Sequence, residues 1–195
     1  LRAPSISQLR AQSRIAASAQ LHFTLHELFE QQAAHQPKAK AVAWDEGELS
    51  YGELDARSNR LSNFLRDLGF GPGARVAIAL PRSPSFIVAN LAVLKTGGSC
   101  VPLTPSKDDG AAFEATRRSN LVRLALDCVI TLDEHSGQFE HTAPTCVVLD
   151  VESTQIDRCN DKKLYPCVPS SALAYIVDAH RRERLDVAVA LSHAN

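Results

Sequence analysis

Apolar residues near the start of the chain recur at the spacing of an amphipathic helix. Over residues 24–36 they fall on one helical face, and the segment stops before Pro37. Thr24 and Glu27 have the three-residue spacing of a capping box, in which each side chain accepts a hydrogen bond from the backbone N–H of the other residue. The pattern therefore predicts a first helix over 24–36.

A short hairpin and a second helix follow. Residues 41–44 and 49–50 flank a polar turn that contains Gly47, which predicts two antiparallel strands. A second capping box begins at Ser50, and leucines then recur on one face until glycine and proline end the pattern. We therefore expect a helix over 51–68.

The next part of the chain alternates buried strands with a helix. Residues 75–80 and 99–103 are near-continuous apolar runs of strand length, and a helix is predicted between them over 83–94. Two strands joined by a helix form a β-α-β unit, whose strands run parallel. The fold class is therefore predicted to be α/β, with a layered β-α-β sheet flanked by helices.

The pattern is weaker after Pro105. A helix is predicted over 111–123, whereas 133–145 and 151–171 have no clear period and are predicted to be loops. Four further apolar runs have the length of buried strands: 126–132, 146–149, 172–177 and 187–191.

Composition and charge exclude several classes of protein. With 195 residues, of which 45% are hydrophobic, the chain can bury a sizeable core and reads as a soluble globular protein. A formal net charge of −1 gives no long-range attraction to nucleic acid or anionic membranes, and no apolar run approaches the roughly 18 residues that span a bilayer. We predict no nucleic acid and no membrane partner. Five cysteines without a Cys-x-x-Cys pair favour reduced thiols and a cytoplasmic location.

The first 20 residues have a different composition from the rest. They contain arginines and serines but no acidic residue, which is typical of a transit peptide and equally of an interdomain linker. The chain starts at Leu1 and contains no methionine, so we expect it to be an excerpt of a longer polypeptide. The linker interpretation is preferred for 1–20, with 21–195 as one truncated domain.

Three segments of distinctive sequence follow one another in order: Leu25-His-Glu-Leu-Phe-Glu-Gln-Gln, Leu49-Ser-Tyr-Gly-Glu-Leu-Asp-Ala-Arg-Ser-Asn-Arg-Leu and Leu94-Lys-Thr-Gly-Gly-Ser-Cys-Val-Pro-Leu103. Together they resemble the opening of an amino-acid adenylation domain of nonribosomal peptide synthetases. The last two resemble the first and second core motifs of this AMP-dependent synthetase and ligase superfamily. The resemblance is strong over 21–106 and covers 107–195 in outline.

The resemblance carries expectations about fold, activity and partners. It implies the first part of the family's larger N-terminal domain, without the downstream aspartates and the C-terminal catalytic lysine. The family reaction activates an amino or aryl acid with ATP and magnesium to an acyl-adenylate, which is then loaded onto a carrier protein. Condensation and carrier domains of a multidomain synthetase are the implied neighbours.

Residues 173–195 resemble the third core motif of the family at both flanks, Leu-Ala-Tyr and His-x-Asn. The family has a loop of serine, threonine and glycine between them, followed by a lysine, and this loop binds the phosphates of ATP. Here Arg181, Arg184 and Ala188 stand in place of the glycines, and Val187 stands in place of the lysine. The complete set of altered positions is Asp178, Ala179, His180, Arg181, Arg182, Glu183, Arg184, Leu185, Asp186, Val187 and Ala188.

This loop chemistry decides the functional prediction. A left-handed backbone costs a non-glycine residue about 1–2 kcal/mol, so two arginines fit a glycine cradle poorly. We therefore predict a chain that is inactive by itself and binds neither ATP nor magnesium. Phosphate binding by the guanidinium groups of Arg181, Arg182 and Arg184 is an alternative, although Glu183 lies among them. Two further alternatives are an active enzyme completed by downstream sequence and an interaction module between synthetase domains.

Lys95, Gly97 and Gly98 form a second candidate phosphate site. An anion cradle needs backbone N–H groups at the start of a helix, whereas these glycines follow a predicted helix and precede a strand. A C-terminal cap and turn is therefore preferred.

The remaining candidates have structural explanations. His22 and His26 have the i, i+4 spacing of a metal pair but no third ligand nearby in sequence. Ser192 and His193 are adjacent, and neighbours in a strand point to opposite faces, so they cannot form a nucleophile–base pair. Cys100 is expected to be a buried thiol. No catalytic residue and no metal site are predicted.

Overall fold

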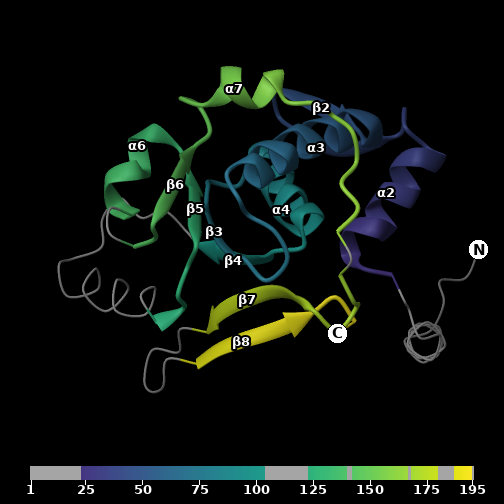
Figure 1. The fold of residues 1–195 in the computed structure, drawn as a ribbon. Coiled ribbons are helices and arrows are strands. Elements are labelled where there is room, and N and C mark those ends of the chain that lie inside the picture. The colour runs from purple at the N-terminus through teal and green to yellow at the C-terminus, as the bar shows by residue number, and fades with distance from the viewer. Residues whose placement is uncertain (1–22, 104–122, 140–141, 167, 180–186, 195) are drawn as a thin grey trace, which may run out of the picture.

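The computed structural model describes residues 23–103, 123–139, 142–166, 168–179 and 187–194, which Figure 1 draws in colour. In the described part the sheet lies beside a group of three longer helices, α2, α3 and α4. The elements are α2 (Leu25–His35), β1 (Lys40–Trp44), β2 (Gly47–Ser50), α3 (Tyr51–Asp67), β3 (Arg75–Ala79), α4 (Pro84–Thr96), β4 (Ser99–Leu103), β5 (Cys128–Thr131), α6 (Asp133–Ser136), η1 (Gly137–Phe139), β6 (Thr145–Val148), α7 (Ser153–Arg158), β7 (Leu173–Ala179) and β8 (Val187–Ser192).

A six-stranded sheet with the order β6-β5-β3-β4-β7-β8 forms the centre of the fold. The first five strands in this order run parallel to their neighbours, and β8 pairs with β7 antiparallel. Strands β3 and β4 pair from Arg75 opposite Ser99 to Ala79 opposite Leu103, with α4 as the connection between them. The predicted β-α-β unit and the α/β fold class are therefore confirmed.

The two faces of the sheet are buried in different clusters. Val76 and Ile78 of β3 pack with leucines of α3 and with Val93 of α4. Ala77 of β3 points to the opposite face and packs in a second cluster with Phe139 of η1. Successive side chains of β3 thus point to opposite faces of the sheet, and both faces are buried. Because both faces are buried, the sequence of β3 is almost continuously apolar.

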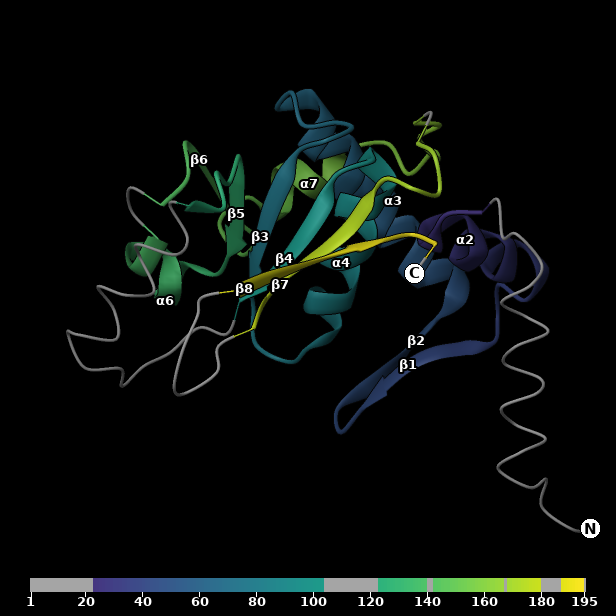
Figure 2. The same ribbon diagram turned by 90° about the horizontal axis from the view of Figure 1, so that it is seen from below.

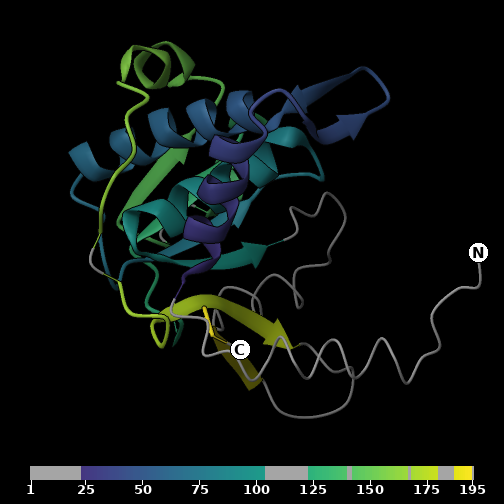
Figure 3. The ribbon, with the colours of Figure 1, turned by 90° about the vertical axis from the view of Figure 1, so that its right-hand side faces the viewer.

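The predicted capping boxes position the first two long helices. At the start of α2 the Glu27 carboxylate accepts hydrogen bonds from the backbone N–H of Thr24 at 2.7 Å and from its hydroxyl at 2.9 Å. At the start of α3 the Ser50 hydroxyl accepts the N–H of Glu53 at 3.3 Å. Figure 3 shows α2 lying against α3 and α4, whereas Figure 2 shows the β1–β2 hairpin projecting from the body of the molecule.

Two loop predictions were wrong. The segment 133–145 contains α6 and η1, and 151–171 contains α7. These three helices have three to six residues, and α7 has no buried residue, so none of them could produce a helical hydrophobic period. The strand predicted over 126–132 exists as the shorter β5, and the strand predicted over 146–149 exists as β6, which has the same length and begins one residue earlier. The helix predicted over 111–123 lies almost wholly outside the described residues.

No helix among the described residues is long and apolar enough to cross a membrane.

Candidate functional site

The third motif is built on the β7–β8 hairpin at one edge of the sheet (Figure 1). The antiparallel ladder pairs Asp178 with Ala188 and Ala179 with Val187, so it continues to both ends of the connecting segment. Asp178 and Ala179 were predicted to belong to the loop, and this was wrong, because the ladder extends β7 by two residues. Val187 and Ala188, which were also counted among the altered loop positions, lie in β8, and the altered positions 180–186 lie outside the described residues.

An apolar pocket with a volume of about 550 Å³ adjoins this hairpin. Among the described residues that line it, the ionisable groups are the hydroxyls of Tyr51 and Tyr175, and burial raises the pKa of Tyr175 to about 12. The side-chain amide of Asn90 is engaged, since it donates to the Phe86 carbonyl at 2.7 Å. A ligand site needs several polar groups that converge on one point, and this pocket lacks them. Its walls are Phe29, Ala41, Val42, Tyr51, Leu54, Phe86, Ile87, Asn90, Leu91, Leu94, Pro102 and Tyr175.

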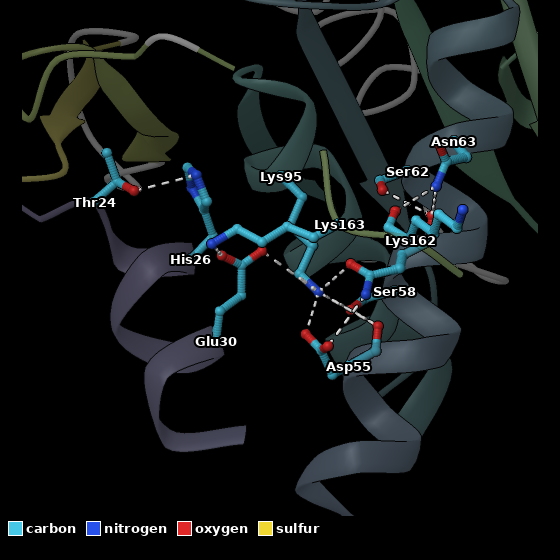
Figure 4. A network of polar contacts seen from close by, with 11 residues as sticks. Thr24, His26, Glu30, Asp55, Ser58, Ser62, Asn63, Lys95, Lys162 and Lys163 are labelled. Carbon is cyan, nitrogen blue, oxygen red and sulfur yellow. Dashed lines mark hydrogen bonds and ion pairs between the residues drawn. The ribbon is translucent and has the colours of Figure 1, made fainter. Parts of the chain in front are cut away.

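A buried lysine is the centre of the main polar network (Figure 4). The side chain of Lys95 at the end of α4 is 0% exposed. Its Nζ donates to Asp55 Oδ1 at 2.6 Å, to Asn59 Oδ1 at 2.7 Å and to Ser58 Oγ at 2.8 Å. All three acceptors lie on α3 at positions i, i+3 and i+4, so one helical face supplies them.

A second helix completes the charge balance around this ammonium group. Glu30 of α2 has a side chain that is 7% exposed, with Oε1 3.9 Å from Lys95 Nζ and Oε2 paired with Lys163. Desolvation lowers the pKa of Lys95, and the hydrogen bond that Lys95 donates to Asp55 opposes this change. Desolvation raises the pKa of Glu30, and Lys163 opposes it. Two cations and two carboxylates thus join α2, α3, α4 and the segment after α7.

This geometry removes Lys95 from the candidate phosphate ligands. Its ammonium group lies inside the helix layer and already has protein acceptors, so no phosphate can reach it. Gly97 has φ +86° and its N–H donates to the Leu94 carbonyl at 3.0 Å, which confirms the predicted C-terminal cap of α4.

Two histidines far apart in sequence meet at the start of α2. The rings of His26 and His193 are in edge contact, with centroids 5.6 Å apart and an interplanar angle of 75°. His193 Nδ1 accepts the backbone N–H of Leu25 at 3.1 Å, and His26 Nε2 lies 3.2 Å from Thr24 Oγ1. Both histidines are buried. His22, which has the i, i+4 spacing from His26 but was not predicted to form a metal site with it, lies outside the described residues.

The other candidates from the sequence, Ser192 and Cys100, do not form a catalytic group with a neighbouring side chain. Ser192 Oγ accepts the N–H of Ala194 at 3.3 Å, whereas the His193 ring contacts α2, so the two adjacent side chains have separate partners. Cys100 is fully buried and its thiol donates to the Asn90 carbonyl at 3.5 Å; burial raises the pKa of this thiol. In the part of the chain that is described, no three His, Cys, Asp or Glu side chains form a group that could hold a metal ion.

Sequence reasoning missed both polar clusters. A signal for the first existed, since Lys95 is the one charged residue of α4. Asp55, Ser58 and Asn59 share one face of the preceding helix. No local pattern identifies the partner of His193, because its contact with Leu25 joins residues 168 positions apart.

Comparison with known proteins identifies the family. Residues 29–191 match the family model described as AMP-binding enzyme. The chain belongs to this family. The adenylation-domain relatives include Dimodular nonribosomal peptide synthase of Bacillus subtilis (strain 168), which is 33% identical over 172 residues, covering 87% of this chain and 6% of that protein. Tyrocidine synthase 3 of Brevibacillus parabrevis is 48% identical over 82 residues, covering 42% of this chain and 1% of that protein.

Solved structures show the same fold. VinN with 3-methylaspartate aligns with a TM-score of 0.77 at 20% identity, covering 89% of this chain and 48% of that chain. The nonribosomal peptide synthetase FmoA3 aligns with a TM-score of 0.73 at 24% identity, covering 88% of this chain and 17% of that chain. These structures show the fold, whereas the family match and the synthetase relatives identify the chain as part of an adenylation domain. The chain spans less than half of each of these proteins.

Proposed function

We propose that this chain forms the N-terminal part of an adenylation domain and does not itself bind ATP or catalyse adenylation. The observation that carries the proposal is the composition of the segment between β7 and β8. Residues 180–186 contain no glycine, lysine, serine or threonine. Backbone N–H groups can surround a phosphate only where the chain adopts crowded or left-handed conformations, which glycine favours.

The residues next to this segment support the same proposal. Val177 of β7 and residues 188–190 of β8 have apolar side chains, which can neither donate a hydrogen bond to a phosphate oxygen nor pair with its charge. Lys95, a cation in the second core motif, is enclosed between helices. These described neighbours of the segment provide no side-chain ligand for a phosphate, which supports the proposal, and we derive no catalytic step from them.

The proposed role is structural, within a multidomain synthetase. The relatives are multidomain nonribosomal peptide synthetases, so condensation and carrier domains are the proposed neighbours. A cytoplasmic location and an interdomain linker over residues 1–20 stay predictions from the sequence.

A loop exchange tests the proposal within a complete adenylation domain, so the result does not depend on the parts of the domain that this chain does not contain. Segment 178–188 is transplanted into a complete adenylation domain in place of its own third-motif loop, and amino-acid-dependent ATP–pyrophosphate exchange is measured. We expect a loss of at least about 100-fold, the size that removal of a single electrostatic donor produces. The matched control replaces only the β8 residues 189–191, whose side chains lie outside the loop, and should keep the exchange rate.

Isothermal calorimetry on this chain with ATP and magnesium gives a second, direct measurement. No heat of binding is expected at micromolar nucleotide. Micromolar affinity, or a transplanted loop that supports normal exchange, would overturn the proposal and favour the arginine-based phosphate site.

A further inference from the structure

The contact between His26 and His193 connects two parts of the fold that the core motifs do not explain. His193 follows β8, and its backbone N–H donates to the Ala172 carbonyl beside the start of β7 at 3.1 Å. Its ring Nδ1 accepts the N–H of Leu25, the first residue of α2, at 3.1 Å. One residue therefore fastens the base of the β7–β8 hairpin to the first turn of a helix.

The hydrogen bonds assign the protons of both rings. His193 Nδ1 is an acceptor, so the neutral ring carries its proton on Nε2. The Thr24 hydroxyl donates to Glu27, so its oxygen accepts from His26, whose proton is therefore also on Nε2. The two remaining ring nitrogens, His26 Nδ1 and His193 Nε2, are buried without a hydrogen-bond partner among the described residues.

Protonation of either ring conflicts with this arrangement. A proton on His193 Nδ1 would face the Leu25 N–H, donor against donor, at the positive end of the α2 dipole. A proton on His26 Nδ1 would be a buried donor without an acceptor, beside the second ring. Both histidines thus fit the fold only in their neutral forms.

We propose that His26, His193 and the Leu25 N–H form a proton-sensitive clasp, which holds the β7–β8 hairpin on α2 when both rings are neutral and opens when they are protonated. The hairpin carries the third core motif, so the clasp couples the position of that motif to pH. This inference concerns the frame of the motif and holds whether or not its loop binds nucleotide.

The surrounding charges are consistent with the clasp. The groups that face His26 are Glu27 on the same helix, Lys95 on α4, Lys163 after α7 and the ring of His193, and Glu27 also faces His193. Burial is the main cause that lowers the pKa of His26 to about 4, with His193 next, while Glu27 opposes the shift. Burial also lowers the pKa of His193.

The direction of the pH effect follows from these shifts. A histidine whose pKa is lowered in the closed state stabilises that state fully above the ordinary value of 6.5, and the contribution is lost as pH falls toward 4. Between pH 7 and pH 5, His26 alone should reduce the ratio of closed to open clasp by about 20-fold.

Amide hydrogen exchange of the full chain tests the clasp. Protection factors, corrected for the intrinsic rate at each pH, are measured by NMR between pH 7 and pH 5 for the Leu25 amide, whose hydrogen bond to His193 Nδ1 is lost when the clasp opens. In the wild type they should fall by about 20-fold. In the double variant His26→Gln, His193→Asn, they should change less than twofold, because amide groups preserve the two hydrogen bonds without titrating.

The exposed His35 at the end of α2 provides the matched control, and His35→Gln should behave as the wild type. Protection that is constant in the wild type, or that falls equally in the double variant, would overturn the clasp. If the double variant does not fold, the imidazole resonances of the wild type decide. Both rings should titrate below 6.5 together with the Leu25 amide shift, and titration of either ring at its ordinary pKa would contradict the proposal.

Discussion

Replacing Lys95 by methionine tests whether the buried charge network stabilises the fold. Methionine has a similar length and apolar character, so the change removes the ammonium group and leaves little empty space. Asp55 and Asn59 would each lose a hydrogen bond of 2.6 or 2.7 Å, and Glu30, 7% exposed, would lose a neighbouring cation.

The expected magnitude follows from the cost of leaving buried charge without its partner. Removing one member of a buried ion pair costs about 3–5 kcal/mol. The side chain of Asp55 is 28% exposed, so water compensates part of its loss, and we expect about 3 kcal/mol. In a chain of this size that corresponds to a decrease in Tm of roughly 6–12 °C.

Urea denaturation followed by circular dichroism measures this free energy, with the exposed Lys38→Met as control, for which a change within about 0.5 kcal/mol is expected. A double-mutant cycle with Asp55→Asn separates the pair from the general cost of substitution, and a coupling of at least about 1 kcal/mol is expected. A loss below about 1 kcal/mol for Lys95→Met, or additive effects in the cycle, would refute a stabilising role for the network.

Two further predictions concern the helix ends. Gly97→Ala should destabilise the fold by at least about 1–2 kcal/mol, because φ is +86° and an added Cβ would lie 2.7 Å from Val168 Cγ2. Gly71 has open space around it, so Gly71→Ala should have little effect in the same urea assay. Ser50→Ala should lower the free energy of unfolding by about 1 kcal/mol, because the N-terminal cap of α3 is lost. The control is Ser85→Ala at an exposed position. An equal effect of both changes on the urea midpoint would contradict the capping argument.

The elements of the first half of the fold could be predicted from local patterns. Capping boxes at Thr24 and Ser50, the glycine after α4 and two apolar runs around it identified α2, α3, β3, α4 and β4. Local signals suffice here because caps and hydrophobic periods act over three to seven residues. The short helices α6 and α7 were missed, since one or two turns contain too few residues for a period.

The features of the candidate site also divide into those that the sequence determines and those that only the tertiary structure determines. The sequence alone determined the family resemblance and the unusual chemistry of residues 180–186, because both depend on the identity and order of neighbouring residues. Only the tertiary structure placed Lys95 against Asp55 and brought His193 to the start of α2. Those contacts join residues 40 and 168 positions apart, and their partners are selected by the packing of helices on the sheet, which no local pattern records.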